Sequence, residues 1–275
     1  MQAMEPVVLL HCSGSSGAQW RALRGQLGPR YRVLAPDLIG YGAERPWCGR
    51  GEFSLAHEAA TVRSLLGRVG EPVHLVGHSY GGAVALHIAR TRPELLRSLT
   101  LIEPSAFHLL RNGDASDAAA LREIKAVAAE AAAALAVGDY GRGFSRFVDY
   151  WSGPGSWADL PAEKRALLAP QLAKVVLDFH ALFAEPAELE DVCDIALPTL
   201  IVQGGCTALP ARCICARLRT ALPDAAFRVV QGAGHMLPLT HRDQVNALVT
   251  AHIEANCAAL QPRPAGSREP AALTV

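Results

Sequence analysis

The chain has 275 residues, and its 26 Lys and Arg side chains balance 26 Asp and Glu side chains. Because no basic excess is present to neutralise phosphates, we expect no nucleic-acid partner. Half of the residues are hydrophobic and 19% are charged, which is ordinary for a soluble globular protein. No apolar run stands out as long enough to span a bilayer, so we expect no membrane partner either.

The first 104 residues alternate between short apolar segments and segments with helical spacing. We predict strands at 7–11, 32–36, 73–77 and 97–102. Helical patterns separate them, at about 18–28, 53–69 and 80–92. Short apolar strands that alternate with helices are typical of a parallel sheet covered by helices on both faces, the α/β class.

The pattern changes over residues 105–190, where helical stretches at about 117–137 and 161–185 flank a segment rich in aromatic residues. Alternation then resumes, with strands predicted at 198–203 and 226–230 and helices at about 209–221 and 241–256. We therefore expect a core domain from residues 1–104 and 191–260, a helical cap inserted at 105–190, and a flexible tail at 261–275.

The cysteines indicate the cellular compartment. There are seven, an odd number, at spacings that form no disulfide framework. Cys213 and Cys215 lack a second pair of ligands nearby, so we expect no metal site. Reduced thiols, and the absence of a basic and then apolar leader, favour a cytoplasmic protein. The cysteines are Cys12, Cys48, Cys193, Cys206, Cys213, Cys215 and Cys257.

The strongest motif is the Gly-His-Ser-Tyr-Gly sequence at residues 77–81, between a predicted strand and a predicted helix. A sharp turn there lifts the Ser79 hydroxyl out of the sheet edge, and it leaves room only for glycine two residues before and after. Serine needs a base, and His235 follows the last predicted strand, at the same edge of the sheet. His74, His87 and His241 belong to regular elements or their ends, and we expect the His78 side chain to point away.

These motifs together resemble the α/β-hydrolase superfamily, and in particular its serine esterases. The segment at 11–14 (His-Cys-Ser-Gly) resembles the family's oxyanion loop, and residues 35–42 resemble its second-strand signature. The resemblance covers about residues 7–255 and implies about six mostly parallel strands, since the usual leading hairpin is missing. It implies no cofactor. Cys12 departs from the pattern, because that position often holds glycine.

The acid of the expected triad is displaced in this sequence. The family usually places an Asp after the strand predicted at 198–203, but residues 204–210 contain no carboxylate. Glu103 directly follows the strand predicted at 97–102, a position that some dehalogenase-like members use for the acid. Pro104 favours an extended conformation for Glu103. The open alternatives are a capping or salt-bridge role for Glu103, and a Ser–His dyad without an acid.

Two backbone N–H groups, those of Ser13 and Tyr80, are expected to form the oxyanion hole, and Asp37 is expected to brace the oxyanion loop. The resulting hypothesis is a serine hydrolase that cleaves a small carboxylic ester through an acyl-enzyme on Ser79, with His235 as base and Glu103 as acid. Thioester, lactone, amide and C–C cleavage remain open, as does the oligomeric state.

Two alternatives come from other functional classes. One is a hydrolase-like protein that binds a small molecule without turnover. The other is a nucleotide-binding oxidoreductase, because Gly14 and Gly17 follow the first strand and Asp37 lies 20 residues after Gly17. Cys12 stands where the leading glycine of that fingerprint belongs, which weakens this alternative.

Overall fold

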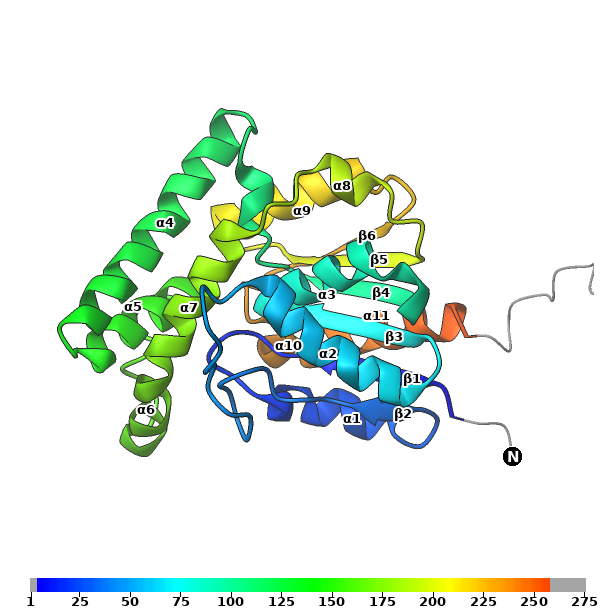
Figure 1. Ribbon diagram of the computed structural model, residues 1–275, viewed down its shortest axis with the longest axis horizontal. Helices are drawn as coiled ribbons and strands as arrows, with labels where there is room; N and C mark the ends of the chain where they lie inside the picture. Colours follow the sequence, from blue (N-terminus) through cyan, green and yellow to red (C-terminus); the bar gives the residue numbers. More distant parts are fainter. Residues whose placement is uncertain (1–3, 258–275) are drawn as a thin grey trace, which may run out of the picture.

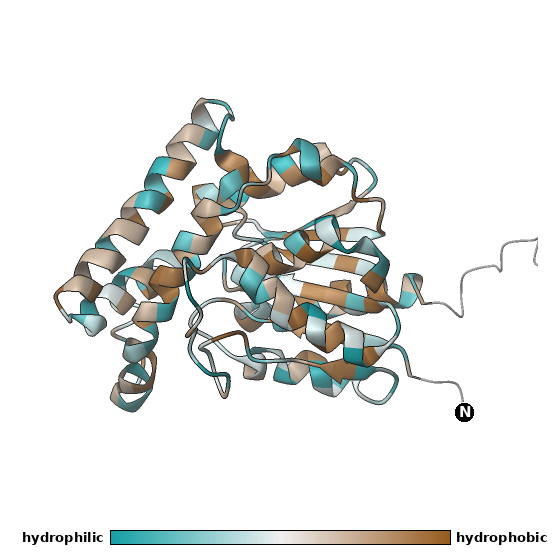
Figure 2. Cartoon of the chain, viewed as in Figure 1, coloured by the Kyte–Doolittle hydropathy of each residue, from teal (hydrophilic) through white to brown (hydrophobic). Residues whose placement is uncertain are grey.

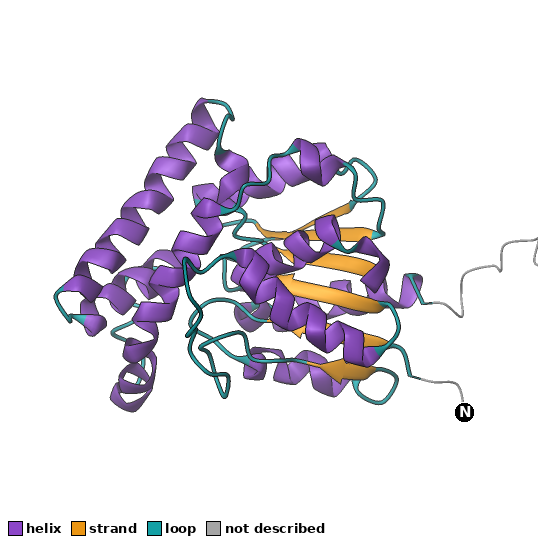
Figure 3. Cartoon of the chain, in the orientation of Figure 1, coloured by secondary structure: helices purple, strands orange, loops and turns teal. Residues whose placement is uncertain are grey.

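The computed structural model describes residues 4–257. Its sheet has six strands, all parallel, in the order β2-β1-β3-β4-β5-β6 (Figures 1 and 3). The expected fold class, a parallel sheet of about six strands flanked by helices, is confirmed. The strands are β1 (Pro6–Leu10), β2 (Arg32–Leu34), β3 (Val73–His78), β4 (Leu96–Ile102), β5 (Thr199–Gly204) and β6 (Ala226–Val230).

Helices cover both faces of the sheet, which explains why the central strands are apolar on both sides. One buried cluster joins the sheet to α2 (Leu55–Val69), α3 (Tyr80–Thr91) and α9 (Leu209–Ala221). A second cluster joins the opposite face to α1 (Arg21–Leu27) and α11 (Arg242–Ala255). Figure 2 shows the hydrophobic colouring of the central strands between these layers. The sheet is thus a rigid support for the loops at its strand ends.

A helical segment lies between β4 and β5, and we call residues 105–190 the insertion. It begins with the 3-10 turn η3 (Phe107–Leu110), and α4 follows an Asp114 capping box. In Figure 1 its long helices stand to one side of the sheet, beyond β3 and β4. The helices are α4 (Ala115–Ala136), α5 (Tyr140–Ser152), α6 (Ala162–Leu168) and α7 (Leu172–Ala184), with the short turn η4 (Ala169–Gln171) before α7, and α8 (Glu190–Cys193) begins at the last residue of the insertion.

One stretch of the insertion is more apolar than the sequence analysis recognised. Residues Ala162–Ala184 are long and hydrophobic enough, by length and composition alone, to cross a membrane, because an 18-residue window within them has a mean hydropathy of 1.4. The expectation that no apolar run is long enough to span a bilayer is therefore wrong. In the fold the stretch forms α6, η4 and α7, and α7 contacts α3 of the sheet domain and buries side chains that include Val175.

The elements differ from the sequence prediction at several points. The aromatic segment before residue 160 contains a helix, α5, which begins after the side chain of Asp139 accepts a hydrogen bond from the Arg142 N–H. The first predicted helix starts as the 3-10 turn η1 (Gly17–Trp20). A short helix, α10 (Leu237–Thr240), precedes α11. The predicted tail at 261–275 lies outside the described residues.

Candidate active site

Ser79 occupies a sharp turn between β3 and α3, with φ of 53° and ψ of −116°. The neighbouring glycines permit this turn, because a Cβ at Gly77 would lie 2.3 Å from the carbonyl oxygen of Gly81. A Cβ at Gly81 would lie 2.5 Å from the Leu10 carbonyl oxygen. Neither position can hold a larger residue without moving the backbone, so the glycine spacing has the steric cause that the sequence analysis assigned to it.

The side chains of Ser79, His235 and Glu103 form one line of hydrogen bonds. The Ser79 Oγ lies 2.9 Å from His235 Nε2, and His235 Nδ1 lies 2.6 Å from Glu103 Oε2. All three residues are buried. Because a carboxylate only accepts, we assign the proton to Nδ1, which leaves Nε2 free to accept from the Ser79 hydroxyl. This arrangement can deprotonate a serine.

The Glu103 carboxylate is held by the loop after β5, the loop in which the sequence shows no acid. Its Oε1 accepts from the Gly204 N–H at 2.6 Å, and its Oε2 accepts from the Thr207 hydroxyl at 2.7 Å. Glu103 has φ of 42°, so the expected extended conformation is wrong. The reason is tertiary: its N–H donates to the Val202 carbonyl at 3.0 Å while the side chain turns into that loop, and these contacts outweigh the preference imposed by Pro104.

His78 lies beside His235, which corrects the expectation that its side chain points away. Its Nε2 lies 2.9 Å from the His235 carbonyl oxygen, and its Nδ1 lies 3.1 Å from the Gln19 amide nitrogen. Burial lowers the pKa of His78 well below its ordinary value. The neutral ring therefore donates from Nε2 and fixes the backbone of the histidine loop without adding charge next to the base.

The remaining histidines considered from the sequence lie outside this cluster. His74 is buried in β3 and contacts the Ser98 hydroxyl at 2.8 Å, His87 contacts Glu185, and His241 precedes α11. None of them is among the hydrogen-bond partners of Ser79 or His235 in the described part of the chain.

The expected oxyanion donors sit on two different elements. Tyr80 is the first residue of α3, so its N–H belongs to the first helical turn, whose donors have no intrahelical partner. Ser13 lies in the loop after β1, where the Cys12 N–H donates to Gln19 Oε1 at 3.1 Å. Asp37 accepts from the Gly17 N–H at 2.7 Å, the bracing that the sequence analysis expected.

His11 supports the oxyanion loop through both of its ring nitrogens. Its Nδ1 lies 2.7 Å from the Cys12 carbonyl oxygen, and its Nε2 accepts from the Leu38 N–H at 2.9 Å. Burial lowers the pKa of His11 from 6.5 to about 4, so the ring is neutral at physiological pH. A neutral ring is also what the contacts require, because one nitrogen must donate while the other accepts.

A small cavity lies over Ser79 and is lined mainly by residues of the insertion. The Trp151 ring lies against the His235 ring, tilted by 32° with a centroid distance of 4.0 Å. The cavity volume of about 10 Å³ is room for about one water molecule. Most of the lining is apolar, with hydroxyls and one carboxylate at the reactive end. The lining residues are Ser13, Ser79, Ser105, Phe107, Phe147, Trp151, Val175, Asp178, Phe179 and Leu182.

Three contributors to the site were not found from the sequence. Ser105 places its Oγ 3.0 Å from the Ser79 Oγ, Thr207 supports Glu103, and Trp151 covers His235. Thr207 could have been found from the sequence, because it supplies a hydroxyl donor in the loop where the family usually places the acid. Nothing in the pattern distinguished Trp151 from the other aromatic residues of its segment.

One group of potential metal ligands exists among residues 4–257. Glu5, His74 and Cys257 bring their ligand atoms within 4.8 Å of one another. The group lies at the start of β3, whereas Ser79 follows its end. His74 Nδ1 already contacts the Ser98 hydroxyl at 2.8 Å, and the Arg97 guanidinium faces Glu5 at 3.6 Å. A cationic neighbour does not favour a metal ion, so we assign no metal centre there.

Comparison with known proteins identifies the family. The model described as the alpha/beta hydrolase family matches residues 7–248. The chain belongs to the alpha/beta hydrolase family. This α/β hydrolase is 30% identical over 246 residues to the pimeloyl-[acyl-carrier protein] methyl ester esterase of Aeromonas hydrophila, covering 86% of this chain and 91% of that relative. The relatives therefore support a hydrolase, and an esterase in general terms.

Solved structures agree on the fold of this α/β hydrolase. A thermophilic esterase from Thermogutta terrifontis superposes with a TM-score of 0.69 at 23% identity, covering 91% of this chain and 89% of that one. An α/β hydrolase enzyme from a Medee basin deep-sea metagenome library superposes with a TM-score of 0.75 at 17% identity, covering 98% and 94%. At these identities the likeness concerns architecture alone.

Proposed function

We propose that the protein is a serine hydrolase that cleaves a small carboxylic ester through an acyl-enzyme on Ser79. The observation that carries the proposal is the continuous line from the Ser79 hydroxyl through His235 to the Glu103 carboxylate, with distances of 2.9 and 2.6 Å. That geometry is what a nucleophile, a base and an orienting acid require. The esterase relatives support the same reaction class.

The reaction proceeds in two halves. The Ser79 oxygen attacks the ester carbonyl while His235 Nε2 takes the hydroxyl proton, and the Ser13 and Tyr80 N–H groups stabilise the negative oxygen that forms. The tetrahedral intermediate collapses, the C–O bond to the alcohol breaks, and His235 returns the proton to the leaving oxygen. Water then attacks the acyl-enzyme with His235 as base and releases the carboxylic acid and Ser79. Glu103 stabilises the imidazolium in both halves.

The lining of the cavity indicates the substrate. Six apolar side chains of the lining favour a small apolar acyl or alcohol group. As part of the proposal, the substrate is a small molecule, without a nucleic-acid or membrane partner. The seven free cysteines favour action in a reducing compartment such as the cytoplasm.

The oxidoreductase alternative loses its main support. It needs the Asp37 carboxylate to bind a ribose, but Asp37 accepts from the Gly17 N–H at 2.7 Å and from the Ala43 N–H at 2.8 Å. The binding-protein alternative rested on the apparent absence of an acid, and the Glu103 carboxylate 2.6 Å from His235 Nδ1 supports the hydrolase proposal instead. No observation favours either alternative over hydrolysis.

The test is turnover of p-nitrophenyl esters of increasing acyl length by the wild type and by Ser79→Ala. The variant should lose activity by at least about a thousandfold with an unchanged melting temperature. Ser105→Ala is the matched control, because its hydroxyl lies 3.0 Å from that of Ser79 but outside the line to His235. Folded Ser79→Ala with wild-type turnover, or loss confined to Ser105→Ala, would reject Ser79 as the nucleophile.

A further inference from the structure

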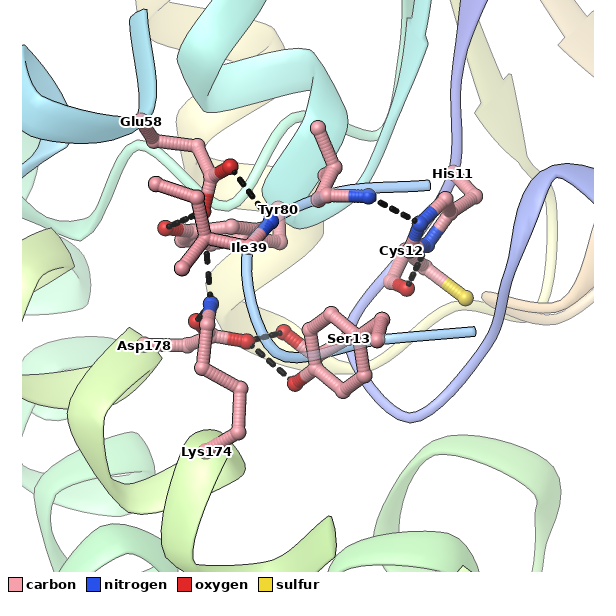
Figure 4. Close-up of polar contacts among 10 residues, drawn as sticks. His11, Cys12, Ser13, Ile39, Glu58, Tyr80, Lys174 and Asp178 are labelled. Carbon is pink, nitrogen blue, oxygen red and sulfur yellow. Dashed lines mark hydrogen bonds and ion pairs between the residues drawn. The ribbon is translucent and has the colours of Figure 1, made fainter. Parts of the chain in front are cut away.

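The two residues expected to form the oxyanion hole share a feature that neither the family match nor the triad explains. The side-chain hydroxyls of Ser13 and Tyr80 both donate to one buried group of charged side chains. The group consists of Lys174 and Asp178 from α7 and Glu58 from α2 (Figure 4). We call these three residues the ion cluster. The cluster therefore links the insertion to both sides of the proposed oxyanion hole.

Ser13 is held by the carboxylate of Asp178. The Ser13 hydroxyl donates to Asp178 Oδ2 at 2.6 Å, and the Tyr41 hydroxyl donates to the same oxygen at 2.5 Å. The other carboxylate oxygen is ion-paired with Lys174, one turn earlier on α7. A side chain of the insertion thus fixes the loop that carries the Ser13 N–H.

Tyr80 is held by the carboxylate of Glu58. The Tyr80 hydroxyl donates to Glu58 Oε2 at 3.1 Å, and the Ile39 N–H donates to Glu58 Oε1 at 2.9 Å. The Lys174 ammonium lies 3.3 Å from Glu58 Oε2 and also pairs with Asp178. Lys174 consequently bridges the carboxylate that holds Tyr80 and the carboxylate that holds Ser13.

The ion cluster is buried to a degree that stability alone does not explain. The side chains of Lys174, Glu58 and Asp178 are 7%, 0% and 2% exposed. The Lys174 ammonium also lies 4.6 Å from the centroid of the Tyr80 ring and 4.7 Å from those of Tyr41 and Phe53. Apolar residues of similar volume are often as stabilising as a buried ion pair. Directional contacts to Ser13 and Tyr80 are what apolar residues could not provide.

We infer that Lys174, Asp178 and Glu58 are positioning residues, which set the distance between the Ser13 and Tyr80 N–H groups and make the oxyanion hole depend on the docked insertion. The inference rests on the proposed function, because it concerns the oxyanion of the Ser79 reaction. Opening of α7 to admit substrate would release Ser13, and redocking would restore the donor pair around the bound ester. The ion pairs of Lys174 with Asp178 and Glu58 would then control the catalytic rate, although none of these side chains touches the reacting atoms.

The experiment removes the side-chain links and keeps both backbone donors. Ser13→Ala and Tyr80→Phe each retain the backbone N–H group but lose the hydroxyl that bonds to Asp178 or Glu58. We expect kcat to fall by about ten- to a hundredfold with KM within about threefold, less than the hundred- to thousandfold that loss of a donor costs. Affinity for a phenylboronic acid, which forms a tetrahedral adduct on serine, should fall by the same factor as kcat/KM.

A double-mutant cycle tests whether one cluster is responsible. Lys174→Met should lower kcat by itself, and Lys174→Met combined with Tyr80→Phe should cost less than the product of the single effects. Two variants far from the cluster serve as controls with wild-type kinetics: Tyr31→Phe, whose hydroxyl contacts Cys257, and Ser98→Ala, whose hydroxyl contacts His74.

Each outcome decides the inference. Wild-type kcat and boronate affinity in both Ser13→Ala and Tyr80→Phe would overturn it, even if Lys174→Met fails to fold. Full additivity in the cycle would overturn the shared role of Lys174. Failure of the proposed function is recognised separately, because Ser79→Ala would then keep activity and wild-type Ser79 would not form the boronate adduct.

Discussion

Replacing Glu103 with Gln tests the triad at its least expected member, and the structure determines what the replacement does. Oε1 of Glu103 faces the Gly204 N–H at 2.6 Å, so the amide oxygen of the variant must occupy that place. The amide nitrogen then faces His235 Nδ1. Because that nitrogen donates, Nδ1 must accept, and the imidazole proton moves to Nε2. Nε2 can then no longer accept the Ser79 proton.

We expect Glu103→Gln to lower kcat by about 10⁴-fold, which is about 5 kcal/mol of transition-state stabilisation, as is typical when a triad histidine is held in the wrong tautomer. The melting temperature should change little, since Gln keeps the Gly204 contact and the Thr207 hydroxyl can turn to accept. Steady-state hydrolysis of a p-nitrophenyl ester measures the loss, and nitrogen NMR of labelled histidine reports the tautomer. Glu94→Gln, at an exposed carboxyl, is the control.

The reasoning would be refuted by a folded Glu103→Gln variant that keeps wild-type kcat. It would also be refuted by a variant that loses activity while the His235 proton remains on Nδ1, because the loss would then have another cause.

Three further predictions concern the supports of the site. Thr207→Val removes a donor from the buried Glu103 carboxylate and should lower kcat/KM by about tenfold, while Thr207→Ser stays near the wild type; equal loss in both would point to packing instead. Burial lowers the pKa of His11 from 6.5 to about 4, so its contribution to stability is complete above pH 6.5 and is lost as the pH falls toward 4. The stability lost at pH 5 amounts to about 2 kcal/mol. The urea midpoint should therefore fall less between pH 7.5 and pH 5 in His11→Gln than in the wild type, and an equal fall in both proteins would contradict the prediction. Phe147→Ala opens the cavity over Ser79 and should shift the preferred p-nitrophenyl ester to a longer acyl chain, whereas an unchanged preference would place the acyl group elsewhere.

Much of the fold follows from periodicity and from the geometry of parallel sheets. Strand and helix alternation placed Ser79, Glu103 and His235 after three different strands, whose carboxyl ends meet at one edge. The structure brings their side chains within hydrogen-bond distance. Their catalytic roles remain predictions, and the proposed experiments address them.

What the sequence did not reveal depends on tertiary contacts. Lys174 and Asp178 stand four residues apart on a helix, a spacing typical of an exposed ion pair, and only the packing of α7 on the sheet domain buries them. The helix α5 contains Gly141 and Gly143 and several aromatic residues, which are weak helix formers, so local preference did not indicate it. The positive φ of Glu103 likewise arises from its partners in the loop after β5.

The most direct test of the central claim is covalent labelling with a fluorophosphonate, followed by peptide mapping of the modified residue. Attack by a deprotonated serine oxygen predicts one label on the peptide that contains Ser79 in the wild type. The label should be absent from Ser79→Ala, and its formation should be strongly slowed in His235→Ala. A label on another residue, or equal labelling of the wild type and Ser79→Ala, would contradict the account.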